Sequence, residues 1–208
     1  HVLIPRQDTE TLVELVLEQQ KNQEIRLLDL CTGSGCIAVS LAVKGGYRQV
    51  MAADISEEAL KVARRNWERL RPENQEMKFF QGDLFDALEK DTETFDVITA
   101  NPPYIPTEVI RGLEPEVREP MLALDGTADG LHFYRRIAAE AGRWLRPGGR
   151  IYLEIGYDQG EAVSGLLAEA GFTEIQVVKD LPGKDRVVAA VYGSRREQTG
   201  GSDVRQIR

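Results

Sequence analysis

The sequence has little of what several large classes of protein require. It contains only two cysteines among 208 residues, Cys31 and Cys36, which by themselves are too few for a disulfide framework or a four-ligand metal site. No apolar run approaches the roughly 20 residues that a membrane-spanning helix needs, and no basic-then-apolar signal segment opens the chain. We therefore expect a cytoplasmic domain without a metal centre or a membrane anchor.

An excess of positive charge is also missing. Lysine and arginine number 26 against 34 aspartates and glutamates, which gives a net charge of −8. A protein held mainly to a nucleic-acid backbone needs a basic face, so direct nucleic-acid binding is not expected. What is present is ordinary for one globular domain with a core: 42% apolar and 29% charged residues.

Short apolar runs alternate with stretches of helical spacing along most of the chain. The predicted strands are 26–31, 50–55, 77–83, 95–101, 150–155, 172–180 and 186–192, and the predicted helices are 36–44, 56–71, 131–145 and 159–170. This alternation predicts an α/β fold, a mostly parallel seven-stranded sheet with helices on both faces. The last two strands have no helix between them, which predicts one antiparallel strand. The segments 102–130 and 146–150 are expected to be irregular loop and turn.

A glycine-rich turn follows the first predicted strand. The segment Asp29–Gly35 reads DLCTGSG, in which Gly33 and Gly35 let the backbone turn tightly and approach a ligand. A dinucleotide-binding turn has a third glycine, which is absent here, so pyrophosphate binding is poorly supported. The turn favours a ligand without phosphates, such as S-adenosylmethionine, although a plain tight turn between strand and helix would give the same pattern.

Acidic residues follow the second and third predicted strands. Asp54 can accept hydrogen bonds from both hydroxyls of a ribose, a position that suits NAD and S-adenosylmethionine equally. Its alternative role is to cap the next helix, for which Ser56 is better placed. Asp83 can reach an adenine amino group and Leu84 can cover the ring, with ordinary loop chemistry as the alternative.

The segment Asn101–Tyr104, NPPY, directly follows the fourth predicted strand. Its two prolines stiffen the backbone and remove two N–H donors, so the carbonyls of Asn101 and Pro102 are free to accept other bonds. The Asn101 amide oxygen is a further acceptor, and Tyr104 offers an aromatic wall. Such a set suits a planar NH₂ group, as in an amide or adenine. A rigid turn that only closes the strand is the alternative.

In their order and spacing, these segments resemble class I S-adenosylmethionine-dependent methyltransferases, whose fold is Rossmann-like. The segments that carry the resemblance are DLCTGSGCIA, ADIS, GDLF and NPPYIP. The opening IPRQDTE at 4–10 and ALDGTADGLHFYRRI at 123–137 narrow it to the HemK/PrmC family, the release factor glutamine N5-methyltransferases. The resemblance covers residues 2 to 192.

The resemblance implies a set of site residues. The implied cofactor-binding residues are Cys31, Thr32, Gly33, Ser34, Gly35, Asp54, Asp83, Leu84 and Asn101. The implied substrate-binding residues are Asn101, Pro102, Pro103 and Tyr104, of which Asn101, Pro102 and Tyr104 are assigned to catalysis. Arg6 and Thr9 resemble residues beside the cofactor pocket. The chain departs from the family at Cys31, where the loop often begins with Gly, and at Thr127, where the family commonly has DGG.

The resemblance also implies a reaction and a partner. A methyl group would pass from S-adenosylmethionine to the glutamine of the Gly-Gly-Gln motif of class 1 release factors. Two other functions stay open: DNA or RNA adenine N6-methylation, which uses the same NPPY chemistry, and cofactor binding without catalysis. We expect a monomer with a catalytic domain over 1–192, a polar tail over 193–208, and no equivalent of the family's helical N-terminal domain, which helps bind the release factor.

Overall fold

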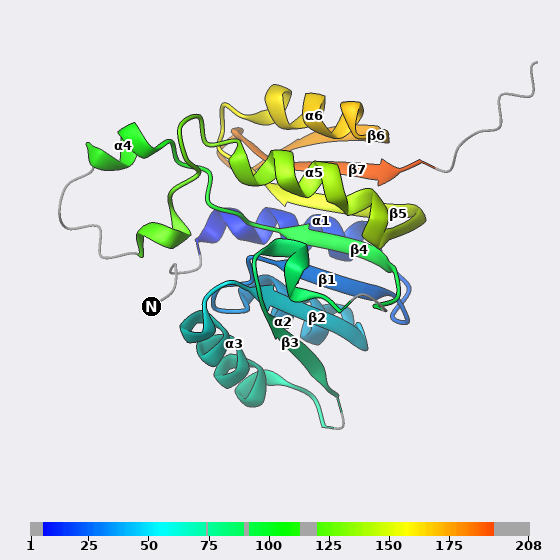
Figure 1. Cartoon of the computed structure of the whole chain (residues 1–208). Coiled ribbons are helices and arrows are strands. Elements are labelled where there is room, and N and C mark those ends of the chain that lie inside the picture. Colours follow the sequence, from blue (N-terminus) through cyan, green and yellow to red (C-terminus); the bar gives the residue numbers. More distant parts are fainter. Residues whose placement is uncertain (1–5, 74, 90–91, 113–119, 194–208) are drawn as a thin grey trace, which may run out of the picture.

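The computed structural model describes residues 6–73, 75–89, 92–112 and 120–193. Seven strands form one sheet in the order β3-β2-β1-β4-β5-β7-β6 (Figure 1). The strands are β1 Arg26–Leu30, β2 Gln49–Asp54, β3 Met77–Gln81, β4 Phe95–Ala100, β5 Leu145–Glu154, β6 Phe172–Lys179 and β7 Asp185–Tyr192. The pairs among β1 to β5 are parallel, and β7 runs antiparallel to both β5 and β6. The predicted fold class is confirmed.

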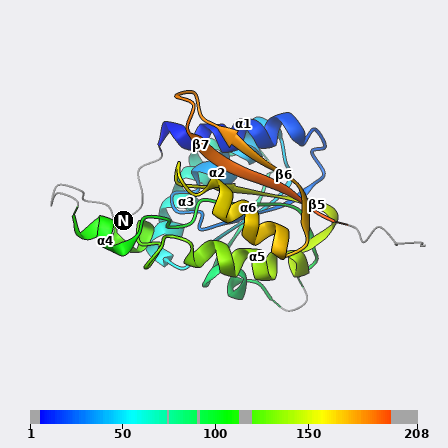
Figure 2. The same ribbon diagram turned by 90° about the horizontal axis from the view of Figure 1, so that it is seen from above.

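Helices cover both faces of this sheet (Figure 2). They are α1 Glu10–Gln19, α2 Cys36–Gly45, α3 Glu57–Leu70, α4 Thr107–Arg111, α5 His132–Trp144 and α6 Gly160–Glu169, with 3₁₀ turns η1 Gln7–Thr9, η2 Leu84–Ala87 and η3 Met121–Ala123. Buried side chains of α1, α2 and α3 form one core with one face of the sheet, and those of α5, α6 and η2 form a second core with the other. The result is a three-layer α/β/α arrangement.

The strand sequences explain this double core. Neighbouring residues of a strand point to opposite faces, so Leu27 lies in the core beneath α1 and α2 while Leu28 lies in the core beneath α5. All six residues of β4 are buried, Asp96 and Thr99 included, as expected for a strand at the centre of a parallel sheet. At the start of α3 the Ser56 hydroxyl accepts a hydrogen bond from the backbone N–H of Ala59, so the predicted cap is confirmed.

Three local predictions differ from the structure. The helix α1 and the preceding η1 were not predicted, although α1 buries Leu12 and Val16 completely. The segment predicted as irregular contains the short helices α4 and η3. The turn predicted at 146–150 falls within β5, which begins at Leu145 and pairs irregularly with β4 near its start. The predicted polar tail lies outside the described residues apart from Gly193.

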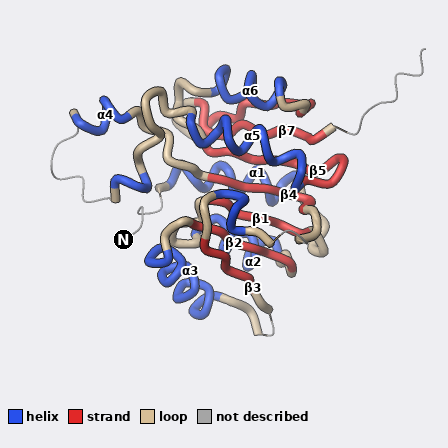
Figure 3. The backbone as a smooth tube through the Cα atoms, in the orientation of Figure 1, coloured by secondary structure: helices blue, strands red, loops and turns tan. Residues whose placement is uncertain are grey.

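The strand order creates a topological switch point between β1 and β4, at the centre of the sheet. The chain runs outward from β1 to β3 and then returns to place β4 on the other side of β1 (Figure 3). The loops that leave the carboxyl ends of β1 and β4 therefore diverge to opposite faces, and in such sheets ligands bind in the gap between them. Among the described residues, no helix is long and apolar enough to cross a membrane.

Candidate active site

A cavity of about 300 Å³ lies at the carboxyl ends of β1, β2, β3 and β4. Its floor is built from the loops that follow these strands, and its other walls come from η1, η3 and the start of α5. The lining residues from the predicted site are Thr9, Cys31, Thr32, Gly33, Ser34, Asp54, Asp83, Leu84, Asn101 and Pro103. Residues far apart in the sequence thus meet in one place, as the parallel sheet requires.

The glycine-rich turn is fixed by hydrogen bonds to the neighbouring strand. The backbone N–H of Thr32 donates to the carbonyl of Ala53 at 3.0 Å, and the N–H of Gly33 donates to Asp54 Oδ2 at 2.8 Å. Gly33 has φ +57°, and a Cβ added there would meet nothing within 4 Å, so the space above the turn is open. Gly35 instead lies against α3, where an added Cβ would come within 3.0 Å of the Cβ of Ala63.

Asp29 anchors the turn from beneath. Its side chain is fully buried and accepts hydrogen bonds from the hydroxyl of Thr32 at 2.6 Å and from the hydroxyl of Thr99 at 2.7 Å. Burial disfavours the charged form and raises the pKa of Asp29 to about 7, although both hydroxyls act in the opposite direction. This carboxyl holds β1, its loop and β4 together at the site.

Replacing Asp29 with Asn should flatten the pH dependence of stability. In the unfolded chain an aspartate ionises near pH 4, whereas in the folded chain Asp29 holds its proton up to about pH 7. Between these values the unfolded state binds fewer protons, so the free energy of unfolding falls as pH rises, by at most about 1.4 kcal/mol per pH unit. Urea unfolding at several pH values measures this slope.

The exposed Asp158 provides the control for this comparison. Asp158→Asn should keep the slope of the unaltered chain, because it removes a carboxyl at the surface and leaves the buried Asp29 in place. Asp29→Asn should lose the share of the slope that Asp29 contributes, up to about 1.4 kcal/mol per pH unit, while the share from the other buried carboxyls remains. If Asp29→Asn kept it as fully as Asp158→Asn does, the protonated state assigned to Asp29 would be wrong.

Asp54 is placed to hold a ribose. It ends β2, lines the cavity, and accepts backbone hydrogen bonds from Gly33 at one oxygen and from Ser56, at 2.9 Å, at the other. Each carboxylate oxygen keeps a further lone pair for a ligand hydroxyl. Burial raises the pKa of Asp54, and its backbone donors oppose this shift. The open turn and this carboxylate fit the ribose and amino-acid ends of S-adenosylmethionine.

Asp83 and Leu84 form the far wall of the cavity. Nη1 of Arg136, from α5, donates to Asp83 Oδ1 at 3.0 Å and forms an ion pair with Oδ2 at 2.9 Å, and Arg136 itself lines the cavity. Leu84 is buried with φ +52°, a left-handed conformation that is uncommon for leucine. The sequence indicated no role for Arg136 or for its neighbour Phe133, which also lines the cavity. The available signal was the pair of arginines in YRRI, one of which could be expected to face the acidic loop residues.

The Asn101–Tyr104 turn leaves the end of β4 and is braced by the loop before α5. The backbone N–H of Ile105 donates to the carbonyl of Leu124, and Gly126 donates back to Ile105. Gly126 and Gly130 let this loop lie directly on Tyr104: a Cβ added at Gly126 would come within 2.8 Å of its Cα, and one added at Gly130 would overlap its carbonyl oxygen. The glycines at 126 and 130 therefore serve close backbone contact with the turn.

Gln159 joins three loops behind the turn. Its Nε2 donates to the carbonyls of Tyr104 at 3.1 Å and Gly130 at 3.3 Å, and its Oε1 accepts from the backbone N–H of Gly156 at 2.9 Å. The loops after β4, before α5 and after β5 are thus fixed relative to one another. Sequence reasoning missed this side chain, because in the sequence it only marks the start of α6.

Comparison with known proteins identifies the family. Residues 7–112 match the sequence model described as "Methyltransferase small domain". A curated "Release factor glutamine methyltransferase" from Thermodesulfovibrio yellowstonii is 46% identical over 192 residues, covering 90% of this chain and 67% of the relative. The chain belongs to the release factor glutamine methyltransferases. The predicted family is confirmed, and with it the predicted cofactor, S-adenosylmethionine.

Further relatives of this methyltransferase agree. A curated relative of the same description from Caulobacter vibrioides is 46% identical, covering 92% of this chain and 66% of its own. The solved structure of "protein-(glutamine-N5) methyltransferase (release factor-specific)" from Alicyclobacillus acidocaldarius is 33% identical with a TM-score of 0.55, covering 92% of this chain and 95% of its own. The chain spans about two thirds of the length of the curated relatives.

Not every residue predicted for the site reaches the cavity. Among the described residues, Gly35, Pro102, Tyr104 and Arg6 fall outside its lining. Pro102 is buried and Tyr104 is half-buried, and both lie in the turn that presents Asn101 and Pro103 to the cavity. Arg6 instead lines a second, more open hollow of about 390 Å³, which shares Thr9 and Cys36 with the first. His132, at the start of α5, also lines the main cavity.

The two departures from the family pattern both fall on left-handed backbone. Cys31 has φ +53° and Thr127 has φ +70°, so the chain keeps a glycine-type conformation where the glycine is replaced. Left-handed backbone costs a residue with a Cβ about 1–2 kcal/mol, and a β-branched residue tolerates it least. Both residues therefore place local backbone strain at the cavity wall.

Replacing Thr127 with Gly should raise the free energy of unfolding by up to about 1 kcal/mol. Relief of left-handed strain exceeds the extra chain entropy that glycine brings to the unfolded state. Urea denaturation measures the change. The exposed Thr173 in β6 provides the control, because glycine there gains no strain relief and should destabilise the protein. A loss of stability at position 127 as large as at position 173 would contradict this account of the loop.

Proposed function

We propose that this methyltransferase transfers a methyl group from S-adenosylmethionine to the side-chain amide nitrogen, N5, of the glutamine in the Gly-Gly-Gln motif of class 1 release factors. The observation that carries the proposal is the braced Asn101–Tyr104 turn at the end of β4, which places Asn101 and Pro103 in the lining of the cavity that contains Asp54 and the glycine-rich turn. The activity for which the relatives are named, release factor glutamine methylation, supports it.

The cofactor-binding roles are assigned to the loops after β1, β2 and β3. The turn from Cys31 to Gly35 would hold the amino-acid end, Asp54 the ribose hydroxyls, and Asp83 with Leu84 the adenine. Arg136 would keep the Asp83 carboxylate in place through its ion pair. When bound, S-adenosylmethionine supplies a methyl group on a positively charged sulfur, which is already a strong methyl donor.

The acceptor-binding roles are assigned to the turn after β4. A glutamine amide nitrogen is a poor nucleophile, because its lone pair is delocalised into the carbonyl. Asn101 Oδ1 and the Pro102 carbonyl would accept hydrogen bonds from its two N–H groups, which fixes the nitrogen and stabilises the positive charge that grows on it. Pro103 and the ring of Tyr104 would confine the flat amide. The proton can leave after transfer, so no strong base is required.

Finer features of the proposal follow from the substrate. A translation factor as substrate places the reaction in the cytoplasm, and the net charge of −8 disfavours direct nucleic-acid binding. We assign catalysis to a single copy of the domain that ends at residue 192. Adenine N6-methylation would use the same acceptors, but the relatives' names favour a protein glutamine.

A labelling experiment tests the proposed function. The chain is incubated with methyl-labelled S-adenosylmethionine and one acceptor in each reaction. The acceptors are a class 1 release factor, the same factor with Gln replaced by Asn in its Gly-Gly-Gln motif, and adenine-containing DNA or RNA. Label should enter only the unaltered release factor, and mass spectrometry should place it on the glutamine side chain. Label in nucleic acid would establish the alternative, and label in no acceptor would overturn the proposed activity for this chain.

A further inference from the structure

The buried glutamate at the end of β5 has no part in the function described so far. Glu154 is 2% exposed, and its Oε2 has no hydrogen-bond partner. Among the described residues it forms no ion pair within 4.0 Å. A buried carboxylate with an unpaired oxygen costs stability. A buried, unpaired carboxyl close to a cavity wall is a candidate for a functional role.

The sheet register places Glu154 beside Asn101. Ala100, the last residue of β4, pairs with Leu153 of β5, so the next residues of the two parallel strands stand side by side at the carboxyl edge. The side chains of Asn101 and Thr9 interact with the Glu154 carboxyl closely enough to lower its pKa. Thr9 and Asn101 both line the cavity, so the glutamate lies directly behind two of its wall residues.

The charge of the carboxyl determines which way the Asn101 amide faces. An ionised carboxylate can only accept hydrogen bonds, so Asn101 must turn its NH₂ toward Glu154. Its carbonyl oxygen Oδ1 then faces away from the glutamate and is available to the acceptor nitrogen. A protonated carboxyl offers an O–H donor, which favours the reversed amide and would present NH₂ to another NH₂.

The surroundings of Glu154 keep its pKa near neutral pH, so that both the ionised and the protonated carboxyl are accessible. Burial is the largest influence and raises its pKa to about 7; Thr9, Arg186 and Asn101 act in the opposite direction, and Asp8 adds to the rise. The other titratable groups that interact with it are Tyr104, Tyr134 and Cys36, from the turn after β4, from α5 and from α2. The hydroxyl of Tyr134 donates to the backbone carbonyl of Glu154 at 2.7 Å.

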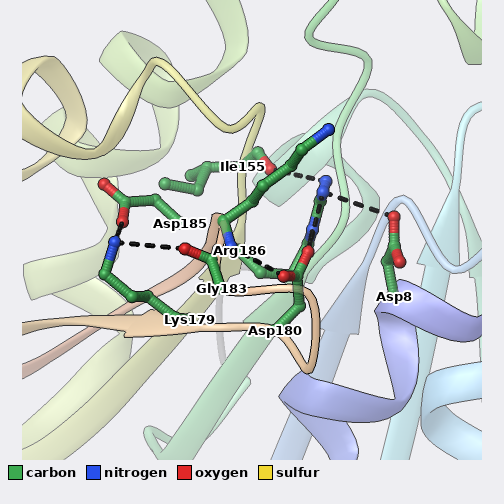
Figure 4. Close-up of polar contacts among 8 residues, drawn as sticks. Asp8, Ile155, Lys179, Asp180, Gly183, Asp185 and Arg186 are labelled. Atoms are coloured by element: carbon green, nitrogen blue, oxygen red, sulfur yellow. Dashed lines mark hydrogen bonds and ion pairs between the residues drawn. The ribbon is translucent and has the colours of Figure 1, made fainter.

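Arg186 lowers the pKa of Glu154 without forming an ion pair with it, because its guanidinium is paired with two other acids. Its guanidinium, from β7, pairs with Asp180 at 3.1 Å and Asp8 at 3.3 Å and donates to the Ile155 carbonyl at 3.2 Å (Figure 4). Figure 4 shows Arg186 between the acid of the β6–β7 turn and the acid of η1. This network ties η1, and with it Thr9, to the end of β5, while Glu154 has no counter-ion of its own among the described residues.

We propose that Glu154 is a positioning residue of this methyltransferase: its carboxylate holds the NH₂ of Asn101 and so directs Asn101 Oδ1 toward the acceptor nitrogen. The proposal rests on the proposed function for its consequence in catalysis, but not for the contact itself. The ionised form is the active one, so turnover should fall as pH decreases through about 7.

The first test needs no activity. The side-chain NH₂ resonances of Asn101 are followed by NMR against pH in the whole chain, assigned by their loss in Asn101→Ala. In the unaltered chain they should shift with an apparent pKa near 7, and in Glu154→Gln they should not. The proposal would be overturned if the Asn101 NH₂ resonances did not change with pH in the unaltered chain, or if they changed equally in Glu154→Gln. This conclusion would hold whether or not the chain methylates release factor.

The second test is kinetic and uses release factor as the acceptor. Glu154→Gln should lower kcat by about 10- to 100-fold, leave the Kd of S-adenosylmethionine within about twofold, and remove the decline of kcat below about pH 7. It should have no further effect in an Asn101→Ala background, because it acts through that residue. The control is Glu169→Gln, an exposed glutamate in the last turn of α6, which should leave kcat unchanged.

Each kinetic outcome bears on the glutamate alone. A normal kcat in Glu154→Gln, an equal loss in both backgrounds, or a pH profile that survives the substitution would contradict the positioning role. Thermal unfolding identifies a variant that fails to fold, in which case the pH profile of the unaltered enzyme and its NMR titration decide. An unaltered chain that methylates nothing would count against the proposed function and leave the NMR result standing.

Discussion

Replacing Asn101 with Ala is expected to lower kcat by about 10²–10³ while the Kd of S-adenosylmethionine changes by no more than a few-fold. The loss follows from the assigned role: Asn101 Oδ1 accepts a hydrogen bond from the acceptor nitrogen and stabilises its growing positive charge, and removal of one such contact typically has this effect. The cofactor affinity survives because Asp54, Asp83 and the glycine-rich turn carry it. Steady-state kinetics with release factor, together with calorimetric titration of the cofactor, measures both quantities.

Tyr104→Phe is the matched control within the same turn. The aromatic wall is kept and only the hydroxyl is lost, so kcat should fall far less than in Asn101→Ala. Thermal unfolding of both variants verifies that the turn still folds. Near-normal turnover in Asn101→Ala would refute the acceptor role, and a matching loss in cofactor affinity would move Asn101 from acceptor binding to cofactor binding.

Replacing Gly130 with Ala should disable the site through the backbone. The new Cβ would overlap the carbonyl oxygen of Tyr104 and lie 3.2 Å from its carbonyl carbon, at a residue with φ +73°. Left-handed strain of about 1–2 kcal/mol therefore combines with a clash against the backbone of the Asn101–Tyr104 turn and against Gln159 Nε2, which lies 2.7 Å from the added Cβ. We expect turnover to fall at least about 10²-fold, since a shift of about 1 Å in a positioned group has that effect.

Gly148→Ala separates the clash from the strain. Gly148 has φ +81°, yet a Cβ there would meet nothing within 4 Å. Its replacement should reduce the free energy of unfolding by about 1–2 kcal/mol and leave kcat unchanged. Urea denaturation and steady-state kinetics on both variants make the comparison. Equal kinetic effects at the two positions, or an active Gly130→Ala enzyme, would show that the turn does not depend on the close contact at Tyr104.

Much of the fold was predictable because buried parallel strands leave a simple signal. The apolar runs of β1, β2 and β4 end at the residues that carry the chemistry, so the sequence alone places Asp54 and Asn101 at the same edge of the sheet. The helix α1 was missed although Thr9, a residue type common at helix starts, is its N-cap; the Thr9 side chain makes no capping hydrogen bond in the structure. The segment 146–150 was predicted as a turn because it contains a proline and two glycines. The irregular pairing with β4 that extends β5 to Leu145 leaves no signal in the sequence.

The site was predictable where it depends on loops that directly follow strands, and not where it depends on tertiary contact. Arg136 and Gln159 are ordinary helix residues in the sequence, and only folding brings them to Asp83 and to the carbonyl of Tyr104. Glu154 is one polar residue in an apolar strand. Its significance depends on the register between β4 and β5, which no local pattern specifies. The predicted domain limits and the roles of the site residues stay predictions.

The positions of Cys31 and Thr127 give a general lesson about motif departures. At both positions the family pattern favours glycine, and at both the backbone retains a positive φ. The surrounding hydrogen bonds determine the conformation here: the Thr32 N–H bond to Ala53 fixes one loop, and the Thr127 N–H bond to Asp125 Oδ1, at 2.9 Å, fixes the other. A missing glycine in a motif is therefore weak grounds for assuming a different loop.

The central claim is that the turn after β4 holds a side-chain carboxamide with its nitrogen directed at the methyl donor. The most direct measurement is a crystal structure of the chain with S-adenosylhomocysteine and a peptide that contains Gly-Gly-Gln. The account predicts the glutamine NH₂ between Asn101 Oδ1 and the Pro102 carbonyl, at about 2.7–3.2 Å from each oxygen, and facing the sulfur. A glutamine bound elsewhere, or a turn whose acceptors face away from the sulfur, would contradict it.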